Sequence, residues 1–157
     1  DEVRVAGLRP GMVALQTPYS MLRREFEGSL RPAVMGEKPI GVLAYEPLCR
    51  GLLTGKFKSQ PTFPESDLRS WDERFQGVRF LHAAGLVSDL ERVGQRLGVA
   101  TSAIAIGWLI AQPGMTAAIV GAKNEQQDRE NAEAFKVALN DKVVIVIDKI
   151  ASLHGGS

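Results

Sequence analysis

The stretch IGVLAYEPLCRGLLTGK, residues 40–56, decides the fold class of this chain. Its first part, residues 40–45, is a continuous apolar run between prolines, which favours a strand buried on both faces. Gly51, Gly55 and Lys56 follow the carboxyl end of that strand and resemble a phosphate-binding loop, although they lack P-loop spacing. The stretch therefore predicts a buried strand leading into a candidate binding loop. The alternative is that both glycines are simple turn residues.

Two further apolar runs extend this pattern along the chain. Residues 12–16 form a short apolar run that ends at a Thr-Pro pair, and residues 116–120 form another that ends at Gly121. Helical segments separate the three runs, and such alternation is typical of a parallel sheet in an α/β protein. Because no repeat and no linker is evident, we expect residues 1–157 to form a single domain.

The segments between the predicted strands differ in how clearly their sequences predict a secondary structure. Apolar residues recur every four positions over 24–36 and predict an amphipathic helix, which Pro32 interrupts. Residues 51–85 show no period and predict a long functional loop that contains short turns at most. Residues 143–147 are apolar and are interpreted as helix; if exposed, they would form an association surface.

Two helix starts are suggested by capping residues. Ser88 with Glu91 three residues later forms a capping-box pattern, and it predicts a helix that ends at Gly98. Thr101 predicts the cap of the next helix, which the Gln-Pro-Gly sequence at 112–114 stops.

The junction Gly121-Ala122-Lys123-Asn124 is a candidate anion site. Asn124 is a suitable cap for the helix that follows, and Gln127 can return the hydrogen bond. A helix start presents unpaired amide donors, Gly121 permits close approach, and Lys123 adds a full positive charge. The alternative is an ordinary strand-to-helix turn with an exposed lysine.

Composition narrows the classes of partner. The net charge is +1 with dispersed charges, so we expect no nucleic-acid partner. No apolar run of about 18 residues is present, so we expect no membrane span. The single Cys49 fits a reducing compartment, which predicts a cytoplasmic location. Asp1 and Glu2 are unlike a signal-peptide start, and the lack of an initiating Met indicates either that residues were removed or that the chain is a piece of something longer.

Four ordered blocks are similar to the second half of aldo-keto reductases: residues 16–24, 45–56, 66–75 and 119–132. The resemblance covers roughly residues 5–150. It implies an α/β fold in which the three strands are the sixth to eighth of a (β/α)8 TIM barrel. Phosphate sites in such barrels commonly use the loops after the last two strands.

The resemblance also implies a site for NADP(H). Gln16 would bind the nicotinamide carboxamide, and Tyr19 would stack on the nicotinamide ring. The pyrophosphate would lie on the segment after the second strand, at Pro47, Leu48, Gly51, Leu53, Gly55 and Lys56. At the junction after the third strand, beside Gly121, the adenosine 2′-phosphate would meet Lys123 and Asn124, and the adenosine would meet Gln127, Glu130 and Asn131.

Three positions bear on how well this site is formed. Glu46 stands where family members often have serine, and its carboxylate would repel phosphate oxygens. Lys123 stands where many relatives have arginine. Lysine keeps the positive charge, but it cannot donate the two parallel hydrogen bonds that a guanidinium group makes to a phosphate. Arg69 is expected either to order the long loop or to form a surface salt bridge.

The family's proton-donating residues have no match in this chain. Reduction of a carbonyl needs an acid that protonates the developing oxyanion. Tyr19 and Tyr45 are matched to other positions, and Tyr45 has strand-end packing as its alternative role. His82 and His154 are interpreted as solvated or packing residues, and no cluster has metal-ligand spacing.

Three parallel strands leave two sheet edges and an apolar face uncovered, so we expect this segment to need a partner. The first hypothesis is a longer chain that supplies the amino-terminal barrel half; the second is self-association. The predicted function is NADP(H)-dependent reduction of aldehydes or ketones by the completed barrel, with this chain as its cofactor-binding part. The alternative is a catalytically silent dinucleotide-binding or regulatory module.

Overall fold

A computed structural model describes residues 11–37, 39–135 and 141–154. In these ranges, three strands form one parallel sheet in the order β1-β2-β3: β1 is Ala14–Pro18, β2 is Gly41–Tyr45 and β3 is Ala117–Ile119. The expected strands are confirmed, with bounds that differ by one or two residues. Register places Gln16 beside Leu43, which lies beside Ala117.

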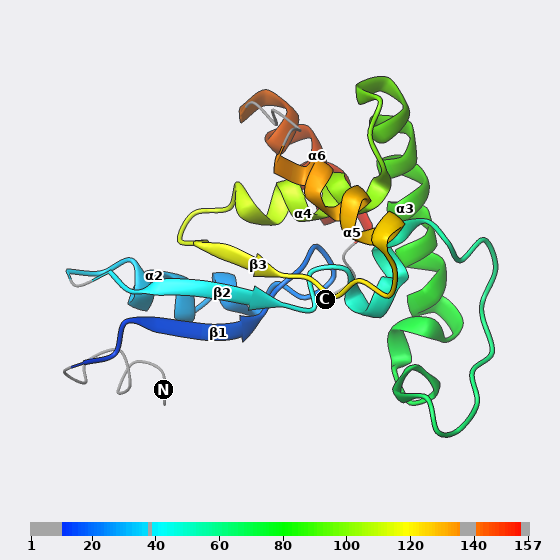
Figure 1. The fold of residues 1–157 in the computed structure, drawn as a ribbon, viewed down its shortest axis with the longest axis horizontal. Helices are drawn as coiled ribbons and strands as arrows, with labels where there is room; N and C mark the ends of the chain where they lie inside the picture. Colours follow the sequence, from blue (N-terminus) through cyan, green and yellow to red (C-terminus); the bar gives the residue numbers. More distant parts are fainter. Residues whose placement is uncertain (1–10, 38, 136–140, 155–157) are drawn as a thin grey trace.

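The helical elements are η1 (Glu25–Glu27), α2 (Leu30–Val34), η2 (Cys49–Thr54), η3 (Leu68–Ser70), η4 (Glu73–Phe75), α3 (Gly77–Leu97), α4 (Thr101–Ile110), α5 (Glu125–Ala132), η5 (Glu133–Phe135) and α6 (Asp141–His154). Figure 1 shows α2 behind the strands and the later helices grouped beyond β3. This β-then-helix order is a segment of a (β/α) barrel, and it confirms the predicted fold class.

The two faces of the sheet differ in burial. Val42 and Ala44 are buried beneath the helices, whereas Leu43 is half-buried and Tyr45 is 39% exposed. The expectation that the middle strand is buried on both faces is therefore wrong for the described residues. Because side chains alternate along a strand, one face is covered and the opposite face is open.

The segment predicted as one helix over 24–36 is divided into η1 and the single-turn helix α2. Pro32 is the third residue of α2. Proline lacks the amide hydrogen and is tolerated only in the first helical turn, so a helix containing Pro32 must begin close to Leu30. The predicted longer helix is wrong for this reason.

The long helix α3 begins at Gly77, not at Ser88. Ser88 lies in the helix interior, and the predicted capping box and the predicted end of the loop at 85 are both wrong. Phe80, Ala83 and Leu86 extend the buried stripe towards the amino terminus. Gly98, with a φ of 70°, ends the helix as expected.

The helix α4 lies at the centre of the packing. All its residues except the last are buried, and Trp108 contacts Tyr19 with 5.6 Å between ring centroids. The helix begins at Thr101, but the N-cap is Ala100 and no side chain caps it, so the predicted threonine cap is wrong. Hydrophobic burial along its whole length stabilises it instead.

The terminal helix α6 confirms the helical interpretation of 143–147, with Ile147 buried and Ile145 and Val146 half exposed. Among the described residues, no single helix has the length and apolar character to cross a membrane. Together α3 and α4 pass that test, with a bend of 94° between them.

Candidate functional site

A cavity of about 940 Å³ lies at the carboxyl ends of β2 and β3. Its walls come from the segment after β2, the connection 56–76, and the junction between β3 and α5. Nine of the predicted site residues line it: Pro47, Leu48, Gly51, Lys56, Gly121, Lys123, Gln127, Glu130 and Asn131. The size is within the range of pockets that hold cofactors and small ligands.

The wall after β2 has an unusual backbone. Glu46, Cys49 and Arg50 have positive φ angles of 55°, 48° and 56°, which are sparsely populated for residues with a side chain. Gly51 follows with a φ of 90°, and a Cβ there would lie 2.6 Å from Nζ of Lys56. Glycine at this position therefore lets Lys56 fold back against the loop.

Two predicted residues of this segment do not border the cavity. Leu53 is fully buried, and a Cβ on Gly55 would lie 2.6 Å from Oε1 of Glu91. Both residues pack the loop against the helices behind it.

Four cationic side chains line the cavity: Arg50 after β2, Lys56 and Arg69 in the connection 56–76, and Lys123 at the junction before α5. Burial, and then the charges of Arg69 and Lys123, lower the pKa of Lys56, while Asp67 opposes the shift. Like charges brought this close destabilise one another, and an anion in the cavity would relieve that cost.

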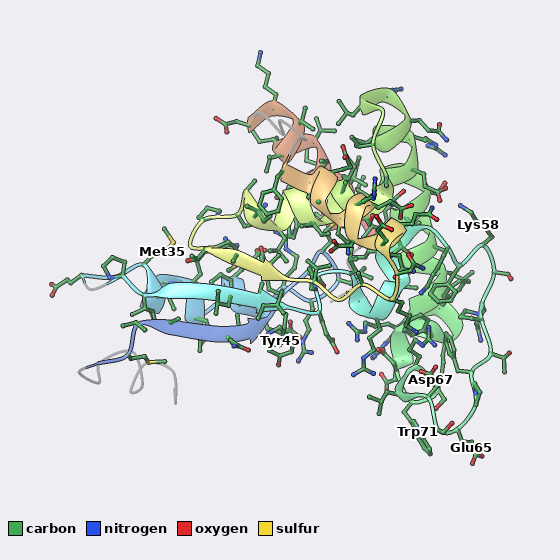
Figure 2. The ribbon with its side chains drawn as sticks, in the orientation of Figure 1. Met35, Tyr45, Lys58, Glu65, Asp67 and Trp71 are labelled. Atoms are coloured by element: carbon green, nitrogen blue, oxygen red, sulfur yellow. The ribbon has the colours of Figure 1, made fainter. Side chains whose placement is uncertain are left out.

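The connection 56–76 holds Arg69 in place by two contacts. Its guanidinium stacks on Phe63 at 4.2 Å from the ring centroid, and its Nε donates to Oδ1 of Asp67 at 2.9 Å. These bonds hold the pKa of Asp67 well below its usual range. Arg69 was expected either to order the long loop or to form a surface salt bridge. The structure shows an ion pair with Asp67, and both residues lie in the cavity wall. Figure 2 shows Glu65 and Trp71 at the far tip of the same connection.

The start of α5 has the predicted cap. Oδ1 of Asn124 accepts from the amide of Gln127 at 2.9 Å, and Oε1 of Gln127 accepts from the amide of Lys123 at 2.9 Å. The returned bond therefore reaches one residue further back than in a standard capping box. Asn124 itself does not line the cavity.

Tyr19 does not occupy the predicted position. Its side chain is fully buried beside Phe26 and Trp108, and its hydroxyl donates to Oε1 of Glu27 at 2.7 Å. Burial, followed by the bond to Glu27, raises the pKa of Tyr19. The expectation that this ring stacks on a nicotinamide is wrong, because no surface of it is exposed.

Tyr45 lies on the open face, where Tyr19 was expected. It pairs in register with Pro18 and Ile119, two positions beyond the pair of Gln16 with Leu43. Gln16 is exposed on the same face (Figure 2 labels Tyr45). The sequence places both tyrosines beside predicted strand ends, and only the alternation of strand faces distinguishes them.

Several cavity residues were missed by sequence reasoning as binding residues: Arg50, Thr54, Pro64, Ser66, Leu68, Ser102, Ile119 and Val120. Most are small or loop residues without a recognisable spacing. Arg50 could have been predicted, because it is a cation within the candidate binding loop that follows residue 45 and contains Gly51 and Gly55.

The histidines lie outside the cavity. His82 is exposed on α3, and Nε2 of His154 lies 2.9 Å from Oδ2 of Asp89, so that α6 is joined to α3. Within the described ranges, no group of three or more acidic, histidine or cysteine side chains is placed to hold a metal ion.

Comparison with known proteins gives consistent matches. Residues 2–152 match the family model described as "Aldo/keto reductase family". Aldo-keto reductase YhdN of Bacillus subtilis is 36% identical over 129 residues, which are 82% of this chain and 39% of that protein. Aldo-keto reductase yakc [NADP(+)] of Schizosaccharomyces pombe is 34% identical over 146 residues, 90% of this chain and 42% of that protein.

The fold of this chain is also similar to that of a solved structure. The glycerol dehydrogenase AKR11B4 from Gluconobacter oxydans superposes with a TM-score of 0.80 at 32% identity, over 90% of this chain and 42% of that one. The chain thus spans about two fifths of the length of these relatives.

Proposed function

This chain belongs to the aldo/keto reductase family, and from that premise we propose that it is the NADP(H)-binding part of an oxidoreductase that reduces aldehydes or ketones. The observation that carries the proposal is the convergence of Lys56, Arg69 and Lys123 on one cavity. Several cations that line one cavity suit a ligand with several phosphate groups.

The residues present fit a dinucleotide phosphate. Gly121 has open space where a Cβ would stand, so a ligand can approach the backbone there. Lys123 would hold the 2′-phosphate at the start of α5, where the helix dipole also favours an anion. Gln127, Glu130 and Asn131 would meet the adenosine, and Asn124 would act by capping the helix.

The carboxylate of Glu46 does not oppose this assignment, because arginines surround it. Its oxygens lie 3.0 Å from Nε of Arg50, 3.4 Å from Nη2 of Arg74 and 3.9 Å from Nη1 of Arg23. The expected repulsion of phosphate is therefore offset by neighbouring positive charge.

The reduced nicotinamide, when bound, supplies the hydride. On this chain, Tyr45 would pack against the nicotinamide ring and Gln16 would hold its carboxamide, since both are exposed on the open face of the sheet. The acid that protonates the carbonyl oxygen would come from the amino-terminal half of the barrel, which would also cover that open face. Self-association is the second way to cover it.

The second candidate is a dinucleotide-binding module without catalysis. It is favoured by one observation: Tyr19, fully buried and bonded to Glu27, is not available as a proton donor, and neither histidine borders the cavity. Both candidates share the cofactor site. A cytoplasmic location stays a prediction that rests on the single cysteine.

Replacing Tyr45 by alanine is expected to weaken NADPH binding about tenfold, because the aromatic contact is lost. Tyr19→Phe is the matched control: it should keep the affinity and lower the free energy of unfolding by about 1 kcal/mol, through loss of the hydroxyl bond to Glu27. Fluorescence titration and urea unfolding measure the two effects. Unchanged NADPH affinity in Tyr45→Ala would contradict the assignment of the ring contact to Tyr45.

Affinity for NADPH is expected to fall as pH rises through the lowered pKa of Lys56. In the free chain, burial and the two neighbouring cations disfavour the charged ammonium. A bound phosphate favours it, so binding takes up a proton between the lowered pKa and the ordinary value of 10.5. By the same argument the free chain gains stability with rising pH in this window, since the unfolded chain binds more protons.

Calorimetry in two buffers of different ionisation enthalpy measures this proton uptake, and Lys56→Met should remove it. Uptake of the same size in Lys56→Met would show that another group is responsible.

A further inference from the structure

Four charged side chains beside the cavity form a closed ring. Glu46, the residue after β2, contacts Arg50 at 3.0 Å and Arg74 at 3.4 Å. Asp72 contacts the same two arginines, Arg74 at 2.6 Å and Arg50 at 3.5 Å. Each acid therefore lies between two bases, and each base lies between two acids.

This ring is partly shielded from water. Side-chain exposure is 7% for Asp72, 21% for Arg74, 24% for Glu46 and 34% for Arg50. Burial acts against the charge on Asp72, yet Arg74 and then Arg50 keep its pKa below the ordinary value. The bond to Asp72 raises the pKa of Arg74. Charges held in this way interact more strongly than exposed surface pairs.

The ring joins two segments that are distant in sequence. Glu46 and Arg50 follow β2, whereas Asp72 and Arg74 stand at the far end of the connection 56–76. Arg50 also donates from Nη1 to the carbonyl oxygen of Leu68 at 3.1 Å, in the middle of that connection. Glu46, Arg50 and Leu68 all line the cavity, so the ring lies on its border.

The backbone at Glu46 fits a fastening role. Its φ of 55° is unfavourable for a residue with a side chain and requires compensating contacts. Arg23, from the connection between β1 and α2, approaches the same carboxylate at 3.9 Å. The Glu46 carboxylate thus contacts arginines from three segments at the carboxyl edge of the sheet: the one after β1, the one after β2 and the connection 56–76.

We propose that Glu46 is a positioning residue: by closing the ring with Arg50, Asp72 and Arg74, it fastens the connection 56–76 across the cavity and keeps Arg69 facing the ligand. The part of this proposal that concerns the ligand rests on the proposed cofactor function.

Amide hydrogen exchange tests the fastening without any ligand. The amides of Ser70 and Phe75 are bonded within the connection, to the carbonyl oxygens of Asp67 and Asp72. Glu46→Gln removes one charge from the ring at constant size, and it is expected to speed exchange at both amides about tenfold. Exchange in α4 should not change. Wild-type exchange rates at Ser70 and Phe75 in Glu46→Gln would overturn the proposal.

The control variant is Glu73→Gln, which breaks an exposed ion pair between Glu73 of the same connection and Arg79 of α3. It should leave the exchange of Ser70 and Phe75 unchanged. The double variant Glu46→Gln with Arg74→Gln should exchange no faster than the faster single variant, because either change opens the ring. An effect equal to the product of the two single effects would contradict a closed ring.

Release of NADPH by the wild-type chain and by Glu46→Gln tests the role in binding, with displacement followed by stopped-flow fluorescence. We expect Glu46→Gln to release NADPH about tenfold faster, with little change in the association rate. Faster amide exchange with unchanged release would overturn the role towards the ligand. A wild-type chain that binds no NADPH would refute the proposed function, and the exchange experiment would still decide whether Glu46 fastens the connection.

Discussion

Lys123→Glu is expected to weaken NADPH binding at least about a hundredfold and to remove any preference for NADPH over NADH, because it replaces attraction by repulsion at the 2′-phosphate. Lys123 is exposed at the junction that begins α5, and it lies close enough to lower the pKa of Lys56. NADH has no 2′-phosphate, so its affinity should change much less. Titration of both nucleotides with both proteins measures the difference.

The control for this experiment is Lys149→Glu. Lys149 is an exposed lysine on α6 and does not line the cavity, and its replacement changes the net charge by the same amount. We expect it to leave both affinities within about twofold, because charges beyond a Debye length are screened at physiological salt. Equal losses for NADPH and NADH in Lys123→Glu would place the 2′-phosphate elsewhere.

Adding an amino-terminal barrel half to this chain is expected to produce carbonyl-dependent oxidation of NADPH. The chain alone should not catalyse this reaction. The open face bearing Gln16 and Tyr45 would then be covered, and an acid from the added half would stand across from the nicotinamide. The amino-terminal part of a relative such as YhdN, joined to this chain, provides a suitable test protein.

In the completed protein, Lys123→Glu should raise the KM for NADPH far more than it lowers kcat, because the proposed contact of Lys123 with the 2′-phosphate would lie far from the reacting atoms. Turnover by the chain alone would contradict the assignment of the acid to the missing half. Binding of NADPH without turnover in a folded, completed protein would favour the silent module.

The sequence predicted the sheet and its carboxyl-edge site because these depend on local patterns. Short apolar runs, a capping asparagine and glycines beside strand ends are visible at short range. The start of α3 was missed because Gly77 and Gly85 resemble loop residues. Gly85 is in fact a packing glycine, since a Cβ there would lie 2.7 Å from the ring of His154.

The error on Tyr19 has a different physical cause. Side chains alternate between the two faces of a strand, so Tyr19, three positions after Gln16, lies on the covered side and not on the open face with Gln16. Gln16 and Tyr45 are placed there by the register of β1 with β2, and Tyr19 turns into the core beyond the strand. Register is a property of two strands and cannot be read from either one.

The charged ring was unpredictable for a related reason. Arg50 is a local partner of Glu46, four residues along the chain, but only the path of the connection 56–76 brings Arg74 to the same carboxylate. Sequence analysis identified Glu46 as a repulsive departure from the family pattern. The structure shows it neutralised within a network.

Direct titration of the purified chain with NADPH and NADH is the most direct test of the cofactor site. Quenching of Trp71 and Trp108, energy transfer to the reduced nicotinamide and a mass measurement by size exclusion would be recorded on the same sample. We expect saturable binding that prefers NADPH and is lost in Lys123→Glu. A folded chain that binds neither nucleotide would contradict it, because the convergent cations would then not form a working phosphate site on this chain.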